Sequence, residues 1–188
     1  AAVICIFDPL RAEAKDAIRA LHACGISKVV MMTGDNRRTA ASVAEEVGVD
    51  EFYAEVLPED KAAFIRREKA AGRTVIMIGD GVNDSPALSE ADAGVAISTG
   101  AAIAREIADI TIASEDLFEL VTLRKISEAL MGRIHRNYRF IVGFNLGLIV
   151  FGVAGLLPPT TSALLHNAST LAISLKSMTN LLPDKKKI

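Results

Sequence analysis

Tryptophan is absent from the 188-residue sequence, and aromatic residues make up only 5% of it, so its hydrophobic content of 51% is mainly aliphatic. No excess of positive charge is present, since the formal net charge is -2, which argues against a nucleic-acid partner. Cysteine is limited to Cys5 and Cys24, whose separation fits no metal or redox motif. We therefore expect ordinary buried or reduced thiols.

The sequence also has no initiator methionine, no signal-peptide pattern, no internal repeat and no low-complexity segment. It begins inside an apolar segment, and we therefore expect a piece of a longer protein. The length allows one domain and a smaller additional part. We expect domain boundaries that give a soluble domain over 1–116, a linking helix over 117–136, a helical hairpin over 137–182 and a basic tail over 183–188.

Strand and helix patterns alternate through the first 120 residues or so, with short connections. This alternation predicts an α/β fold with a Rossmann-like parallel sheet covered by helices on both faces. The expected strands are 3–7, 28–32, 52–55, 74–78, 94–97 and 110–113. The expected helices are 8–23, 36–47, 58–71, one from 85 and one over 101–107.

The last third of the sequence contains long stretches with little charge. An amphipathic helix is expected over 116–136, followed by the uncharged run 140–157 and, after Pro158-Pro159, by 160–182, whose only charge is Lys176. Both runs are long enough to cross a bilayer as helices, and the flanking basic residues predict that both outer ends are cytoplasmic. The alternative is a helical pair buried in a soluble core.

The most informative segment is 76–88, which reads IMIGDGVNDSPAL. An apolar strand ends at Gly79-Asp80-Gly81, and Pro86 suits the first turn of a helix, so Asp80, Asn83 and Asp84 lie on the loop between them. That edge of a parallel sheet is where ligands bind. Two nearby carboxylates and phosphate suit Mg²⁺, although a simple Asp/Asn/Gly turn would favour the same residues.

Two further segments fit a phosphate site at the same edge. Thr33-Gly34-Asp35 ends a strand just before a helix, where a hydroxyl and backbone amides can bind a phosphoryl oxygen. Lys61 lies in the first turn of the helix that begins at Pro58, and its ammonium group can neutralise phosphate charge. Taken alone, the first segment is also typical of helix capping and the second of a solvated lysine.

Together these segments resemble the P-type ATPases, within the haloacid dehalogenase-like superfamily. The resemblance implies that Asp80 and Asp84 hold Mg²⁺, and that Thr33 and Lys61 contact a phosphorylated aspartate. Gly34, Asp35 and Asn83 would support them. It also implies an ATP-driven ion transporter in the cell membrane. The partners of this chain would then be the transported ion, the bilayer and the remainder of the pump polypeptide.

The family's phosphorylation sequence DKTGT is absent, and so are its nucleotide-binding and actuator segments. The resemblance therefore covers only about the last quarter to third of such a pump, and we expect the chain alone to be inactive. Asp8 ends the first strand but lacks the residues that follow the family's nucleophile. Two alternatives remain: a membrane-anchored phosphatase that uses Asp8, and a non-catalytic half of a split pump.

A membrane part of two helices after the soluble domain resembles the heavy-metal class of these pumps. Asn145, His166 and Asn167 are then candidate ligands of the transported transition-metal cation, since polar groups at membrane depth are costly. Hydrogen bonding between the helices is the alternative. The Tyr-Asn pair and the Met-x-x-Ser-Ser run of the copper subclass are missing, which disfavours Cu⁺ without fixing another metal.

Overall fold

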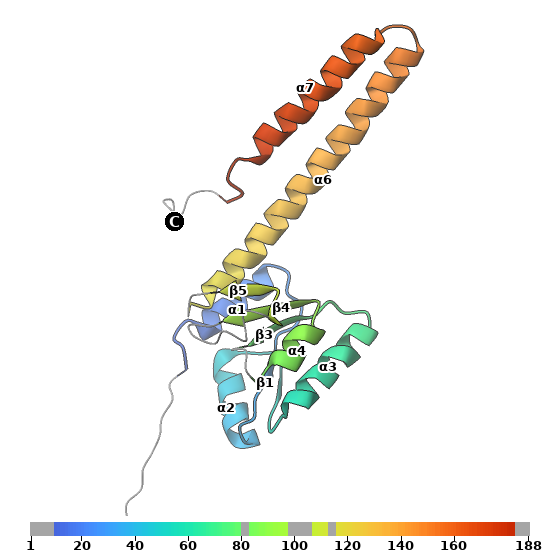
Figure 1. Ribbon diagram of the computed structural model, residues 1–188. Coiled ribbons are helices and arrows are strands. Elements are labelled where there is room, and N and C mark those ends of the chain that lie inside the picture. The colour runs from blue at the N-terminus through green and yellow to red at the C-terminus, as the bar shows by residue number, and fades with distance from the viewer. Residues whose placement is uncertain (1–9, 80–82, 98–106, 113–115, 183–188) are drawn as a thin grey trace, which may run out of the picture. The chain divides into compact units, whose positions relative to one another are not determined.

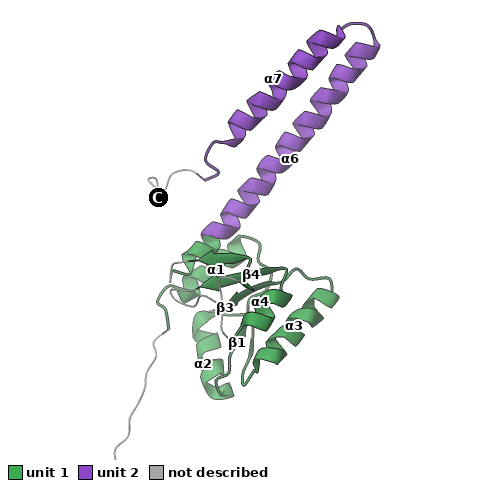
Figure 2. Cartoon of the chain, in the orientation of Figure 1, with its two compact units in different colours: residues 1–121 green, residues 122–188 purple. Residues whose placement is uncertain are grey.

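The computed structural model describes residues 10–79, 83–97, 107–112 and 116–182. The chain divides into two compact units, Ala1–Val121 and Thr122–Ile188 (Figure 2). The first contains all the described strands and the second contains most of a helical hairpin, so the division follows the change in composition seen in the sequence.

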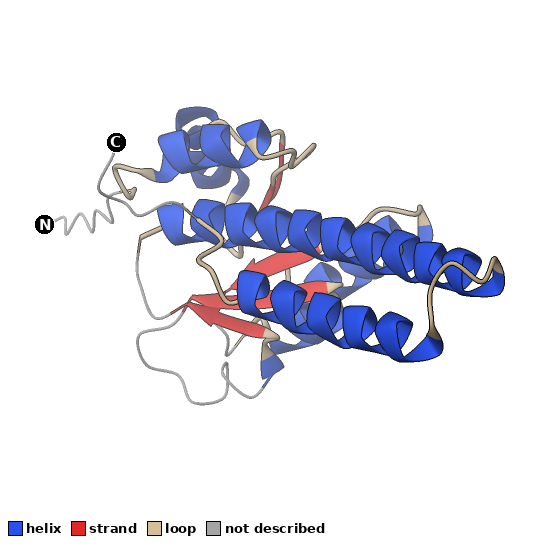
Figure 3. Cartoon of the chain, turned by 90° about the horizontal axis from the view of Figure 1, so that it is seen from above, coloured by secondary structure: helices blue, strands red, loops and turns tan. Residues whose placement is uncertain are grey.

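The described strands of the first unit form two parallel sheets (Figures 1 and 3). One sheet pairs β1 (Val30–Met32) with β2 (Glu51–Tyr53), and Met31 is in register with Phe52. The other has the order β3-β4-β5, with β3 at Ile76–Gly79, β4 at Ala93–Ile97 and β5 at Ile110–Ile112. All pairings are parallel, as predicted.

The prediction of one continuous sheet is not reproduced among the described residues, because β1 pairs only with β2 and β3 only with β4. The expected strand over 3–7 and most of the expected helix over 101–107 lie outside the described part of the chain. Ile76 and Ile78 of β3 are exposed. Sequence periodicity identifies strands but not which strands become neighbours.

The first unit has four helices with described bounds, and α2 begins and ends at recognisable signals. The four helices are α1 (Ala14–Ala23), α2 (Arg37–Val47), α3 (Pro58–Ala70) and α4 (Ser85–Glu90). The Asn36 side chain accepts a hydrogen bond from the Thr39 N–H at 3.0 Å, so it caps α2 as expected. Gly48 ends α2 at a φ of 82°, in the left-handed region that glycine adopts without strain.

Small side chains dominate the core of the first unit. Its largest fully buried side chains are Ile65, Leu88 and Val95, and most other buried positions are alanines. At Gly94, a Cβ atom would lie 2.7 Å from the Leu88 carbonyl oxygen, so β4 and α4 approach more closely than any side chain permits. This close packing holds α4, and therefore the loop before it, against the sheet.

The second unit is a hairpin of two helices that run side by side in Figures 1 and 3. α6 is continuous from Phe118 to Val153, and α7 runs from Pro159 to Ser177. A single helix therefore covers nearly all of the expected linking segment and most of the first apolar run. Arg133 Nη1 donates to the carbonyl oxygens of Ser177 and Thr179 at 2.8 and 2.6 Å, which ties the end of α7 to α6.

The expectation that this hairpin spans a membrane is not confirmed. Across the described segments of the chain, no helix combines the length and the apolar character that crossing a bilayer requires. α6 ends at Val153, before the uncharged run 140–157 is complete, so its apolar part is shortened. α7 carries serine, threonine, histidine and asparagine side chains and Lys176, which lower its mean hydropathy.

Candidate functional site

Lys61 and Asp84 form the central contact of the candidate site. Lys61 Nζ lies 2.6 Å from Asp84 Oδ1, and the two side chains are only 15% and 12% exposed. Lys61 comes from the first turn of α3 and Asp84 from the residue before α4, and these two helices pack on each other. The structure thus brings together two residues that lie 23 positions apart in the sequence.

Asp84 occupies the N-cap position of α4 but makes no capping hydrogen bond with its side chain. An aspartate at that position ordinarily accepts a hydrogen bond from the first turn of its helix. Here the carboxylate is turned toward Lys61 instead and is largely withdrawn from solvent. This geometry argues against the interpretation of the segment as a simple turn.

Gly79, the last residue of β3, makes room for this carboxylate. A Cβ atom at position 79 would lie 2.5 Å from Asp84 Oδ2 and 2.8 Å from Asp84 Cβ. Any other residue would therefore displace Asp84. Sequence reasoning assigned Gly79 only to the end of a strand and missed this role; its position beside the Asp80 loop was the only available signal.

The start of α3 fixes Lys61. Pro58 occupies the first helical position, and the Asp60 carboxylate accepts a hydrogen bond from the Leu57 N–H at 3.2 Å. Proline and an acidic residue both favour this end of a helix, since the backbone N–H groups there lack helical partners. The local sequence thus sets where the helix begins, and α3 directs Lys61 at Asp84.

The Thr33-Gly34-Asp35 segment forms a closed turn after β1. The Thr33 hydroxyl donates to the Asp35 carboxylate at 2.8 Å and accepts a hydrogen bond from the Asp35 N–H at 3.1 Å. Asp35 is exposed, and Thr33 is half-buried. For this hydroxyl to donate to a phosphoryl oxygen, it must first leave the Asp35 carboxylate.

The remaining predicted residues of the soluble site are only partly placed. Asp80, the second expected carboxylate, and Asp8, the alternative nucleophile, lie outside the described residues. Asn83 is exposed. Within the described ranges, no group of three or more histidine, cysteine, aspartate or glutamate side chains could hold a metal ion. Of the two predicted magnesium ligands, Asp84 is the one that the structure describes, and its carboxylate suits a hard cation.

In the hairpin, the structure brings two of the three candidate ion ligands together. His166 Nδ1 of α7 lies 2.8 Å from the Asn145 Oδ1 atom of α6, which fits a hydrogen bond from the protonated nitrogen to the amide oxygen. Such a bond leaves Nε2 of the ring as the free ligand atom. Asn167 is exposed, and its side chain makes no hydrogen bond with the described part of the chain.

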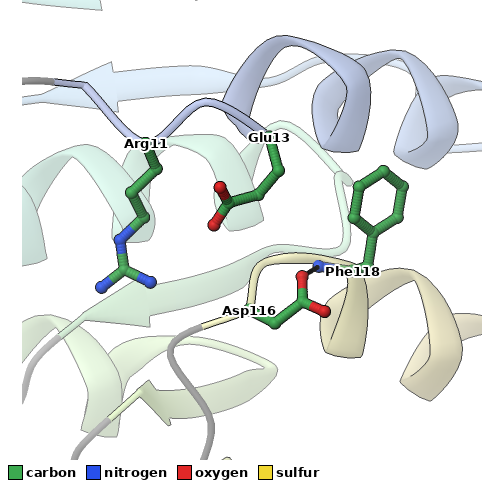
Figure 4. Close-up of a pocket in the computed structure, with 4 residues that line it drawn as sticks. All are labelled: Arg11, Glu13, Asp116 and Phe118. Carbon is green, nitrogen blue, oxygen red and sulfur yellow. Dashed lines mark hydrogen bonds between the residues drawn. The ribbon is translucent and has the colours of Figure 1, made fainter.

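A separate surface depression lies where the segment before α1 meets the start of α6 (Figure 4). Arg11, Glu13, Asp116 and Phe118 line it. The Asp116 carboxylate accepts a hydrogen bond from the Phe118 N–H at 2.8 Å, which closes a turn at the start of α6. The depression is open, and none of the residues expected to carry chemistry lines it, so we assign it no role in the site.

Comparison with known proteins defines the class of the soluble part. Residues 1–92 match the family model described as haloacid dehalogenase-like hydrolase. These residues include Thr33, Lys61 and Asp84, which the structure places on the loops and helix ends described above. Most of the first unit is therefore similar to haloacid dehalogenase-like hydrolases.

The relatives of the chain are more specific. It is 46% identical over 165 residues to copper-transporting ATPase 2 of Rhizobium meliloti (strain 1021), and this alignment covers 88% of this chain and 20% of that protein. It is 41% identical over 172 residues to the manganese-exporting P-type ATPase of Mycobacterium tuberculosis (strain ATCC 25618 / H37Rv), covering 91% and 24%. The chain is thus homologous to metal-transporting P-type ATPases and spans about a quarter or less of their length.

A solved structure gives the same result. The crystal structure of a zinc-transporting PIB-type ATPase in an E2.Pi state matches with a TM-score of 0.85 and 33% identity, covering 91% of this chain and 28% of that one. A match of this extent includes most of the hairpin as well as the first unit. The predicted resemblance to the heavy-metal P-type ATPases is thereby confirmed.

Proposed function

We propose that this chain is part of an ATP-driven transporter of transition-metal cations, and that its first unit supplies part of a Mg²⁺-dependent phosphoryl-transfer site. The observation that carries the proposal is the Lys61–Asp84 pair, in which an aspartate gives up its capping role to lie in a nearly buried contact with lysine. The pair includes Asp84 from the loop that follows β3, and the carboxyl ends of parallel strands are where α/β sheets bind ligands. The relatives' names support ATP-driven metal transport.

The proposed site combines residues of opposite charge. Lys61 would neutralise a phosphoryl group carried by an aspartate of another segment, and Thr33 would donate a hydrogen bond to it. Asp84, with Asp80, would hold Mg²⁺, which supplies positive charge for the transferring phosphoryl oxygens when it is bound. Among the described residues, Lys61 balances the charge of the largely buried Asp84 carboxylate.

We further propose that the hairpin works at the membrane. Many large apolar side chains of α6 and α7 are exposed, among them Leu146, Val150 and Leu171, and Val153 is 86% exposed. Such a surface requires an apolar environment, which the bilayer or the other helices of a transporter would provide. The basic residues at its outer ends favour a cytoplasmic location for both ends and for the first unit.

The transported ion would use the Asn145–His166 pair. Imidazole nitrogen suits zinc, copper, cobalt or nickel, whereas amide oxygen suits harder ions such as manganese. The copper, manganese and zinc transporters among the relatives span this range, so the proposal specifies a divalent or monovalent transition-metal cation and not one element. Asn167 is the third proposed ligand.

The decisive experiment replaces Asp84 in the intact protein that contains this chain. Asp84→Asn keeps the size of the side chain but removes its charge, so phosphoenzyme formation from γ-labelled ATP should fall by roughly a hundredfold or more. Raised Mg²⁺ should restore part of it. Asp16→Asn is the control, because Asp16 is exposed and pairs with Arg19 one turn along α1. Unchanged labelling in Asp84→Asn would refute the proposed site.

A second candidate function is a phosphatase that uses Asp8. The specific observation in its favour is that the matched hydrolase family model includes residue 8. The 188-residue chain by itself should then hydrolyse a generic phosphate ester with Mg²⁺, and Asp8→Asn should abolish that turnover. Under the leading proposal the chain alone is inactive, because it contains no DKTGT sequence.

A further inference from the structure

The connection between β2 and α3 contains an unusual backbone conformation. Glu55 has a φ of 56°, and it is the one non-glycine residue with a positive φ in the part of the chain that the structure describes. Residues other than glycine and asparagine rarely adopt this left-handed backbone conformation, because the Cβ atom crowds the backbone there. A glutamate in this conformation is held in place by its surroundings.

Those surroundings are the Thr33-Gly34-Asp35 turn. The Glu55 N–H donates to the Asp35 carbonyl oxygen at 2.9 Å, and the Val56 N–H donates to the Thr33 carbonyl oxygen at 3.0 Å. The Val56 carbonyl oxygen also lies 4.0 Å from where a Cβ atom on Gly34 would be. The backbone of Glu55 and Val56 thus holds the Thr33 turn from both of its ends.

The same connection leads directly into the helix that carries Lys61. Leu57 is the N-cap of α3 and Pro58 its first residue, so the direction in which the chain leaves Val56 decides where α3 begins. Lys61 then reaches Asp84 at 2.6 Å. One short segment therefore contacts Thr33 on one side and positions Lys61 on the other.

The side chain of Glu55 contributes nothing visible to this arrangement. It is exposed, and it makes no hydrogen bond or ion pair with any residue the structure describes. The backbone conformation of Glu55, and not its carboxylate, is therefore the feature that connects the Thr33 turn with the start of α3.

We infer that Glu55 is a positioning residue that, through its left-handed backbone, holds Thr33 and Lys61 in the arrangement that phosphoryl transfer needs. The inference rests on the proposed function, since it concerns the same site. A negative φ at position 55 would redirect both N–H donors and turn the start of α3. Either change would move Thr33 relative to Lys61 without altering any group that contacts substrate.

The test compares three substitutions in the intact protein that contains this chain. Glu55→Val, whose branched side chain disfavours the left-handed region, should lower the rate of phosphoenzyme formation at saturating ATP by about tenfold or more, because small misplacements in a site cost large factors in rate. The KM for ATP should not change, since no nucleotide contact is removed. Glu55→Gly and Glu55→Asn should stay within about twofold of the wild-type rate, because both residues adopt this conformation readily.

A measurement on the 188-residue chain separates positioning from unfolding. In Glu55→Val, hydrogen exchange at the Val56 amide should accelerate, whereas exchange at Ala44 in α2 should stay as in the wild type. If Gly and Asn impair phosphorylation as much as Val does, the carboxylate is required and the inference is wrong. It is equally wrong if Glu55→Val keeps the wild-type rate.

Measuring Asp84→Asn in parallel distinguishes failure of the positioning role of Glu55 from failure of the proposed function. Loss of phosphorylation in Asp84→Asn with a normal Glu55→Val protein refutes the positioning role and leaves the proposed function intact. Full phosphorylation in Asp84→Asn refutes the proposed function. The exchange rate of Val56 then still decides whether Glu55 holds the Thr33 turn.

Discussion

At the scale of single residues, several carboxylates of the first unit are partly buried, and each accepts a hydrogen bond from a specific donor. Glu68 of α3 is only 9% exposed, and its carboxylate accepts a hydrogen bond from Arg73 Nε at 2.6 Å. This contact with Arg73 holds the pKa of Glu68 below its usual value, against the opposing effect of burial. A backbone hydrogen bond from the Val75 N–H lowers the pKa of Asp92 in the same direction.

These lowered pKa values predict that acid destabilises the first unit. A carboxylate whose pKa is lower in the folded state stabilises that state above its ordinary pKa of about 4.5, and the effect is lost as pH falls through the folded pKa. The urea midpoint should therefore fall between pH 6 and pH 3, and Glu68→Gln should reduce that fall. Glu46→Gln, at an exposed position on α2, is the control. An equal fall in both variants would contradict this role of Glu68.

At the scale of secondary-structure elements, the ends of helices decide what the hairpin can do. The last carbonyl groups of a helix have no partners within it. Arg133 of α6 donates to the carbonyl oxygen of Ser177, the last residue of α7, and to those of Thr179 and Asn180 just after the helix. Asn137 adds a hydrogen bond to the Ser177 hydroxyl at 2.9 Å. A guanidinium group suits this task because its donors form a rigid fork.

Removing this contact should loosen the end of α7. In Arg133→Ala, amide exchange in the last turn of α7 should accelerate by roughly fivefold, equivalent to about 1 kcal/mol for lost charged hydrogen bonds at a partly exposed position. Arg133→Lys should rescue only part of it, because lysine is a single-point donor. Arg136→Ala, one turn further along α6 at an exposed position, is the matched control. Equal exchange rates in the two alanine variants would contradict the role of Arg133.

At the scale of the whole molecule, two compact units of different character share one chain. The first has an alanine-rich core and the phosphoryl-transfer candidates, and the second exposes apolar side chains around the Asn145–His166 pair. The continuous helix α6 begins in the first unit and makes up much of the second. In the proposed transporter, a rigid helix is the covalent route by which phosphorylation would affect the ion site.

The two units should therefore be separable by function. In the intact protein, His166→Ala should abolish metal-stimulated ATPase activity, because it removes the strongest proposed ligand of the ion. Phosphorylation from inorganic phosphate should remain, since that reaction does not use the proposed ion ligands of the hairpin. His135→Ala is the matched control, because His135 is the other histidine of the hairpin helices and lies outside the pair. Full metal stimulation in His166→Ala would reduce His166 to a packing residue.

The sequence by itself determined the local features of the site. Proline and glycine positions marked where α3 begins and where α2 ends, and the capping role of Asn36 follows from short-range hydrogen bonding. The parallel character of the strands followed from their alternation with helices. The segment around Asp84 was specific enough to indicate the family that the comparisons confirm.

Only the tertiary structure decided which of these features meet. The pairing of Lys61 with Asp84, the room that Gly79 leaves for it and the hydrogen bonds from Glu55 and Val56 all join segments far apart or in unusual conformations. Helix and strand periodicity reports which face of an element is apolar but not which element covers it. The apolar runs of the hairpin predicted membrane helices from composition alone. The length of each helix, however, depends on where its backbone hydrogen bonding stops in the folded chain.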